Sequence, residues 1–229
     1  MDAEMFIRHE AIRSEIYKLL AESYYPPNEA LPDNILDLIE KLELVGLQDI
    51  NWGGEEILKA DSIEDLTVEH ARLFVGPYTL LAPPYGSVYM EPERRIMGNS
   101  TMDVVKRYQQ SGLDMAGDFK DAPDHIAAEL EFMHFLIFKE IEASNQGDAR
   151  RVYTYLLSQQ SFLADHLGAW VSEFVGKVVE NAQTTFHKNL ARATDTFIKD
   201  DYLTISSLLK SGAYAFEEAN ELESLPIQP

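Results

Sequence analysis

Apolar residues recur at three- and four-residue steps along most of the chain, which is the spacing of an amphipathic α-helix. In the first segment the apolar positions run from Phe6 to Leu20, and Pro26-Pro27 lies just beyond their end. Strand-like alternation of apolar and polar residues is scarce, so the pattern predicts an all-α, single-domain helical bundle. The further helices that the period predicts, with prolines, serines and glycines near their ends, cover 32–46, 62–76, 100–111, 123–147, 151–179 with a break near 166–168, and 185–209.

One stretch, from Val75 to Asn99, breaks this helical pattern. Long loops in compact domains are commonly functional or disordered, and three tyrosines make this one too aromatic for disorder. We therefore expect an ordered loop against the bundle, with an aromatic surface formed by Tyr78, Tyr85 and Tyr89. A proline-rich crossover that serves only packing is the alternative for the same residues. The prolines and glycines that forbid a regular helix across the stretch are Gly76, Pro77, Pro83, Pro84, Gly86, Pro92 and Gly98.

The organisation of the chain is simple, because no internal repeat, low-complexity tract or Ser/Gly-rich linker divides its 229 residues. We expect one domain over 1–229, with 221–229 as a frayed tail. No run approaches the roughly 18 apolar residues that a spanning helix needs, so no stable membrane insertion is predicted. The first residues, MDAEMFIRHE, are acidic and do not resemble a signal peptide. The protein is therefore expected to stay in the cytoplasm.

Charge and cysteine content narrow the classes of function. With 19 Lys and Arg against 39 Asp and Glu, the formal net charge is −20, which repels nucleic acid and favours basic or neutral partners. The chain has no cysteine, which excludes disulfides, thiolate metal sites and cysteine nucleophiles.

A second group of polar residues begins the helix predicted at Pro123. We expect Asp124 in its first turn, where a carboxylate is favoured by the helix dipole, and His125 one turn before Glu129 on the same face. This helix is apolar on nearly every side, which predicts a semi-buried cluster. A capping acid beside a core histidine is the ordinary interpretation, and a pair of polar anchors in an apolar groove is the functional one.

Enzyme motifs are scarce. Glu131 and His134 have the Glu-x-x-His spacing of half a di-iron site, but no other histidine has Glu three residues before it. A helical metalloenzyme using His125, Glu129, Glu131 and His134 is therefore a minor alternative. The sequence has no phosphate loop, His-Glu-x-x-His motif or Gly-x-Ser-x-Gly elbow, so we expect no catalysis and no cofactor.

Taken together, these segments resemble the TorD/DmsD family of redox-enzyme maturation chaperones, which is related to nitrate-reductase delta-type assembly factors. The resemblance spans about residues 65 to 200 and implies an all-helical protein without catalysis. It also implies a groove that binds the twin-arginine signal peptide of a molybdopterin-containing enzyme until cofactor loading and folding are complete, before export. The stretches that carry it are 72–77, 83–89, 98–101, Pro123-Asp124-His125 with Glu129-Leu130, and His166-Leu167-x-x-Trp170.

The resemblance also implies which residues line the groove. Asp124 and His125 would be its polar contacts, and closely similar members carry tryptophan where this chain has Tyr78, Tyr85 and Tyr89. An assembly factor that binds the body of a reductase subunit, rather than its leader, is the main alternative. Family members sometimes exchange helices between protomers, so a monomer and a domain-swapped dimer both fit. The predicted apolar lining is Leu73, Phe74, Tyr78, Pro84, Tyr85, Tyr89 and Gly98.

Overall fold

The computed structural model describes residues 2–48, 61–76, 80–113 and 121–215. Within these ranges the chain forms nine α-helices and one π-helical turn, and no strand, which confirms the predicted all-α fold class. The predicted frayed tail, 221–229, lies outside the described residues. The elements are α1 (Ala3–Ser23), α2 (Leu31–Leu44), α4 (Ile63–His70), the π-helical turn η1 (Ala71–Val75), α5 (Gly86–Met90), α6 (Asn99–Gln110), α7 (Ile126–Asn145), α8 (Ala149–Asp165), α9 (Leu167–Asn181) and α10 (Thr185–Ser211).

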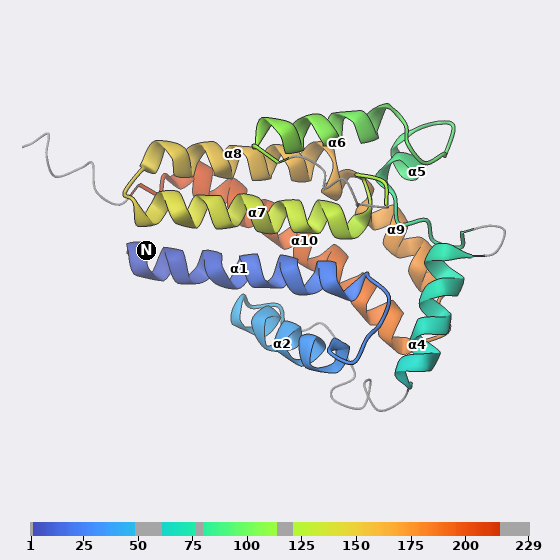
Figure 1. Cartoon of the computed structure of the whole chain (residues 1–229). Coiled ribbons are helices and arrows are strands. Elements are labelled where there is room, and N and C mark those ends of the chain that lie inside the picture. The colour runs from blue at the N-terminus through green and yellow to red at the C-terminus, as the bar shows by residue number, and fades with distance from the viewer. Residues whose placement is uncertain (1, 49–60, 77–79, 114–120, 216–229) are drawn as a thin grey trace, which may run out of the picture.

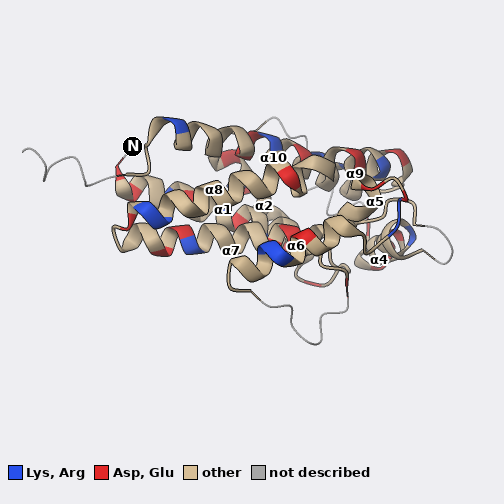
Figure 2. Cartoon of the chain, turned by 90° about the horizontal axis from the view of Figure 1, so that it is seen from above, with Lys and Arg blue, Asp and Glu red and all other residues tan. Residues whose placement is uncertain are grey.

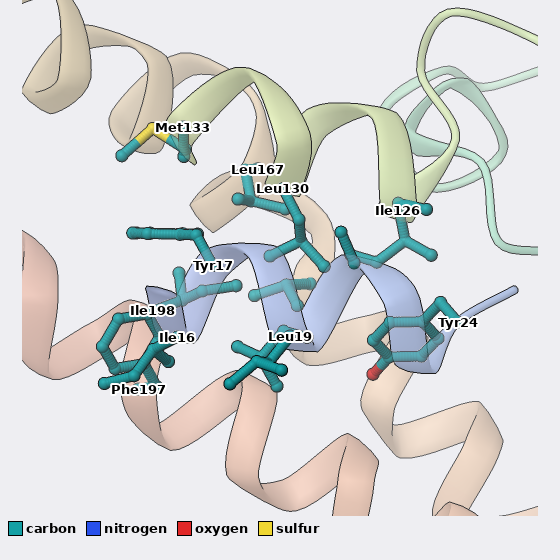
Figure 3. Packing of buried hydrophobic residues seen from close by; sticks show 14 of the residues in the cluster. Ile16, Tyr17, Leu19, Tyr24, Ile126, Leu130, Met133, Leu167, Phe197 and Ile198 are labelled. Carbon is teal, nitrogen blue, oxygen red and sulfur yellow. The ribbon is translucent and has the colours of Figure 1, made fainter. Parts of the chain in front are cut away.

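The centre of the molecule is a bundle in which α1 packs mainly on α7 and α2, while α8 packs on α7, α9 and α10 (Figure 1). In Figure 3, Tyr17 of α1 lies between Met133 of α7 and Phe197 of α10, so three helices distant in sequence share one core. Burial of such apolar side chains is the main free-energy gain of folding. Among the described residues, no helix is both long and apolar enough to cross a membrane.

Several helix ends lie where the sequence predicts them. Ser62 and Asp65 form a capping box at the start of α4, and Thr184 caps α10. The predicted break near 166–168 is confirmed, since α8 ends at Asp165 and α9 begins at Leu167. Only glycine fits at 168, because a Cβ there would lie 2.4 Å from the backbone oxygen of Leu163.

The segment predicted as irregular contains a short helix, α5, between Tyr85 and Glu91. Its five residues lie between Pro84 and Pro92, and a stretch this short shows no helical period. The helix before the segment also differs from the prediction, because it ends in the π-helical turn η1 before Gly76, whose φ is 53°. Residues 77–79 lie outside the described ranges.

A buried ionic cluster joins four helices through Arg13. Its guanidinium binds Asp201 of α10 and Glu10 of α1, and its Nη2 donates to Gln159 of α8 across 3.0 Å. Gln159 in turn donates to Glu140 of α7. A buried arginine is tolerated only when its charge is paired in this way. Asp and Glu are otherwise spread along most helices, in keeping with the net charge (Figure 2).

Candidate functional site

The two regions singled out in the sequence meet in the structure. Tyr85 and His125 form an isolated antiparallel bridge. The backbone N–H of Gly86 donates to the carbonyl of Asp124 across 2.9 Å, and that of Ile126 donates to the carbonyl of Pro84 across 2.8 Å. The loop before α5 is thus fixed to the segment that leads into α7, and its residues and those of 124–126 form one site.

Asp124 lies inside this junction rather than on a helix. Helix α7 begins at Ile126 and His125 is its N-cap, so the expectation of Asp124 in the first turn is wrong. The carboxyl group is 1% exposed, and its Oδ2 accepts a 2.7 Å hydrogen bond from the backbone N–H of Ser87. Its Oδ1 is buried without a hydrogen-bond partner among the described residues. The bond to Ser87 ties the start of α5 to α7.

His125 is held as a neutral ring. Its Nδ1 accepts from the backbone N–H of Ala127 at 3.2 Å, which places the ring proton on Nε2. Burial lowers the pKa of His125 to about 4, although the charge of Asp121 raises it. At neutral pH the side chain is therefore an uncharged helix cap.

Two tyrosines flank this ring. Tyr85 meets His125 edge to face with a centroid distance of 5.3 Å, and Tyr25, two residues after the end of α1, stacks on it at 6.3 Å. Both tyrosines are half-buried, and their hydroxyls donate to exposed carboxyl groups, Tyr85 to Asp121 at 3.3 Å and Tyr25 to Glu131 at 3.0 Å. Burial and the charge of Asp121 raise the pKa of Tyr85 to about 12. These five residues form a surface, here called the tyrosine platform, with aromatic faces inside and acids at its edges.

Trp170 of α9 lies beneath the loop. Its indole N–H donates to Oε2 of Glu129 across 3.0 Å, and its ring stacks on Tyr89 with a centroid distance of 5.6 Å. Gly86 packs directly on it, since a Cβ at position 86 would lie 2.9 Å from Trp170 Nε1. Glu129 is fully buried. Its burial raises the pKa of its carboxyl well above the ordinary value, the bond from Trp170 lowers it, and the charge of Asp124 raises it.

Comparison with known proteins identifies the family. Residues 29–176, more than half of the chain, match the family model described as nitrate reductase delta subunit. The chain belongs to this family. Within it, the similarity is to the TorD/DmsD redox-enzyme maturation chaperones, as the resemblance implied.

Relatives within the TorD/DmsD group share about a quarter of their residues with this chain. A probable Tat proofreading chaperone DmsD of Haemophilus influenzae is 27% identical over 75% of this chain and 80% of its own length. A chaperone protein TorD of Shewanella pealeana is 26% identical over 60% of this chain and 59% of its own length. A crystal structure of a candidate redox enzyme maturation protein from Archaeoglobus fulgidus has a TM-score of 0.54 and 26% identity, covering 81% of this chain and 93% of that one. The two relatives are chaperones, not enzymes.

The residues predicted from the resemblance to line the groove differ in how far they are buried. Leu73 is fully buried, and Phe74 is 5% exposed in an aromatic cluster with Tyr24 and Phe174. Pro84, within the loop before α5, is buried, and Tyr78 lies outside the described residues. Leu73, Phe74 and Pro84 are thus part of the packed interior in this conformation, and their contact with a partner stays a prediction.

Gly98 stands at the start of α6, beside the carboxyl group of Glu91. A Cβ at position 98 would lie 2.0 Å from Glu91 Oε2, and Oε1 of the same carboxyl accepts from the backbone N–H of Ser100 at 2.7 Å. A side chain at position 98 would therefore require the carboxyl group of Glu91, the end of a flexible side chain, to move. The contact of Gly98 with a partner also stays a prediction.

The four residues of the metalloenzyme alternative are occupied by other contacts. His125 accepts from the backbone N–H of Ala127, Glu129 accepts from the indole of Trp170, Glu131 accepts from the hydroxyl of Tyr25, and His134 is hydrogen-bonded to the hydroxyl of Ser14 at 2.8 Å. In the described part of the chain, no group of three or more His, Cys, Asp or Glu is arranged to hold a metal ion. This arrangement gives the metalloenzyme alternative no support.

Proposed function

We propose that the chain is a cytoplasmic chaperone that binds the twin-arginine signal peptide of a molybdoenzyme precursor. It holds the precursor until cofactor insertion and folding are complete, before export. The family assignment supports the role in redox-enzyme maturation, and the name of the Haemophilus influenzae relative, a Tat proofreading chaperone, supports the connection to the twin-arginine route.

The tyrosine platform is the observation that carries this proposal. A twin-arginine leader presents guanidinium groups next to an apolar segment. The faces of Tyr25 and Tyr85 suit the apolar segment, and the exposed carboxyl groups of Asp121 and Glu131 suit the guanidinium groups. The net charge of −20 adds a long-range attraction for a basic peptide.

In this proposal, some of the residues predicted from the sequence contact the leader and others support those that do. Tyr85 and His125 contact the leader directly, with Asp124 beneath them. Tyr89 extends the aromatic surface along the loop, and Tyr78, which lies outside the described residues, stays a predicted contact. The floor that supports these contacts comprises Leu73, Phe74, Pro84 and Gly98.

A second candidate function is an assembly factor that binds the body of a reductase subunit. The match of residues 29–176 to the nitrate reductase delta subunit model favours it, because that model describes a reductase-associated subunit and names no leader. The two functions differ in what part of the client is recognised.

A pull-down with a divided client separates them. The leader of a molybdoenzyme precursor, fused to an unrelated carrier protein, is one bait, and the same precursor without its leader is the other. We expect the chain to be retained by the leader fusion, and not by the carrier alone. Retention by the leaderless precursor alone would contradict leader binding and support the assembly factor.

A further inference from the structure

Helix α6 rests on the bundle through a narrow and partly polar stripe. It lies on the outside of α7 and α8 (Figure 1). Of its twelve residues, only Thr101, Val104 and Tyr108 are buried, and Met102 is 62% exposed. Helix α2, another outer helix, is seated instead by four leucine and isoleucine side chains. An element with so few buried apolar contacts opens at low free energy.

Most of the ties between α6 and the bundle are polar and reach the solvent. His166 donates from Nε2 to Oδ2 of Asp103 across 2.8 Å. Arg107 donates to the hydroxyl of Ser161 at 2.6 Å and to Oδ2 of Asp165 at 2.9 Å. The side chains of Asp103 and Asp165 are 44% and 55% exposed, so water competes for both carboxyl groups. Ion pairs at such positions contribute little to stability.

Helix α5 and its connection to α6 are held no more firmly. Val88 is the only aliphatic side chain that α5 buries. In the connection, Arg94 and Met97 have φ values of 48° and 68°, which lie in a region that is unfavourable for residues other than glycine. Met97 and Ile96 are also exposed, so burial does not compensate for this strain. Because α5 and α6 pack on each other, the two helices can move together.

Buried polar atoms without a partner gather where this segment meets the bundle. On the segment they are the hydroxyls of Ser87, Tyr89 and Thr101, which have no hydrogen-bond partner among the described residues. On the facing side they are Oδ1 of Asp124, whose Oδ2 binds Ser87, and Nδ1 of His166. Buried polar groups are almost always paired. Each of these atoms gains a bond from water when the segment lifts, which lowers the free energy of opening.

We propose that residues 87–110, here called the α5–α6 cover, open and close as one unit while the bundle beneath stays folded. Opening uncovers an aromatic surface of α9. Tyr89 of the cover stacks on Trp170 and meets Phe174 edge to face at 6.2 Å, and these two α9 rings are at most 1% exposed in the closed form. The chain thus has a closed form that hides this surface and an open form that presents it. The opening does not depend on what the chain binds.

The cover is fixed at its start by the bridge between Tyr85 and His125. The backbone N–H of Gly86 belongs to this junction and donates to the carbonyl of Asp124. The next N–H, that of Ser87, is held by the side chain of Asp124. The hinge therefore lies between Gly86 and Ser87, and the bond from Ser87 is the one that opens.

Hydrogen exchange of the full wild-type chain, read by proteolysis and mass spectrometry, tests the cover. We expect amides within α6 to exchange at least about 100-fold faster than amides within α2, which is the control of similar length. The peptide that carries α5 should show the same opening as α6, and α7 should exchange most slowly. Exchange of α5 and α6 as slow as that of α2 would overturn the proposal.

Two variants test whether the cover opens as one unit. Asp103→Asn removes the exposed charge that binds His166 and Arg107, so we expect exchange in both α5 and α6 to rise roughly fivefold while α2 and α7 keep their rates. Glu142→Gln, an exposed acid of α7 paired with Lys139, is the matched control and should leave all rates unchanged. A rise confined to α6 would contradict a single unit.

Thiol labelling gives a second reading of the same opening, because the chain has no cysteine of its own. Ser87→Cys places a thiol at a fully buried position of the cover, and Ala143→Cys places one at a fully buried position of α7. We expect the thiol at 87 to react at least about 100-fold faster than the thiol at 143, which reacts only on global unfolding. Equal rates would overturn the proposal, and if either variant does not fold, the exchange of the wild type decides.

Discussion

The backbone N–H of Ser87 donates to the buried carboxyl group of Asp124 across 2.7 Å, joining residues from two regions 37 positions apart. The sequence predicts Asp124 as a contact for a partner, and the structure shows that it also holds the loop on α7. Loss of binding in a variant of Asp124 therefore has two causes, a missing contact and a loosened loop.

Asp124→Ala is expected to destabilise the fold. The substitution leaves the buried N–H of Ser87 without an acceptor, which costs about 1–3 kcal/mol in the free energy of unfolding. Asp124→Asn should cost less, because its amide oxygen still accepts the bond. Urea unfolding measures both, with the exposed Asp121→Ala as the control expected near the wild-type value. An Asp124→Ala protein as stable as the wild type would refute the role of this bond.

Gly86→Ala is expected to destabilise the loop through a clash. A Cβ at position 86 would lie 2.9 Å from Trp170 Nε1, so either the loop or the indole must shift, at a cost of about 1–3 kcal/mol. The matched control is Gly176→Ala on α9, where a Cβ meets nothing within 4 Å and the helix gains up to about 1 kcal/mol. The midpoint of thermal unfolding should fall for Gly86→Ala and rise for Gly176→Ala. A shift of the same sign for both would contradict this account of Gly86.

Most helices were predictable from the sequence because the three- and four-residue spacing of apolar residues indicates them locally. The site was not, because it depends on contacts between residues far apart in the chain. The bridge between Tyr85 and His125 involves backbone groups, which leave no mark in the order of side chains. Tyr25 was missed as a member of the tyrosine platform. Its position directly before Pro26, at the predicted end of the first helix, was the available signal.

The ionic cluster around Arg13 was also missed, although the sequence contains a sign of it. Glu10 and Arg13 fall on the stripe of the first helix that carries Phe6, Tyr17 and Leu20, all of which are buried. Charged residues within an apolar stripe indicate buried pairing. Their partner Asp201 lies 188 residues from Arg13, and no local pattern identifies it.

The contribution of two buried histidines to stability is expected to fall in mild acid. Burial lowers the pKa of both His125 and His187 to about 4, so both stay neutral in the folded chain at pH values where the unfolded chain is already protonated. Below about pH 6.5 the unfolded state therefore binds more protons at these two rings, and their contribution to the free energy of unfolding decreases as the pH falls from 6.5 through 4, whereas the raised pKa of Glu129 acts in the opposite direction. Urea midpoints across this range test it. His125→Asn should show a shallower decrease than the wild type, and an equal slope would contradict the burial argument.

Tyr85→Ala is expected to weaken leader binding by about 2 kcal/mol, because it removes one side of the tyrosine platform. The loss of affinity should depend little on salt concentration, since the contact is apolar. Salt screens the attraction between an exposed carboxylate and the peptide, so a contact of that kind would weaken as salt is added. Tyr85→Phe should retain most of the affinity, because it loses only the bond from the hydroxyl to Asp121. The control is Tyr153→Ala, an exposed tyrosine of α8 that stacks on Tyr214 and should bind like the wild type. Titration at two salt concentrations measures all three, and a Tyr85→Ala protein with wild-type affinity would exclude Tyr85 from the site.

The most direct test of the central claim is titration of the wild-type chain with two leader peptides that differ only in the arginine pair. One peptide carries the two arginines, and the other carries two glutamines at the same positions. We predict that the arginine peptide binds at least about tenfold more tightly, because its guanidinium groups pair with the carboxyl groups around the tyrosine platform. Equal affinity for the two peptides, or no binding of either, would contradict recognition of a twin-arginine leader.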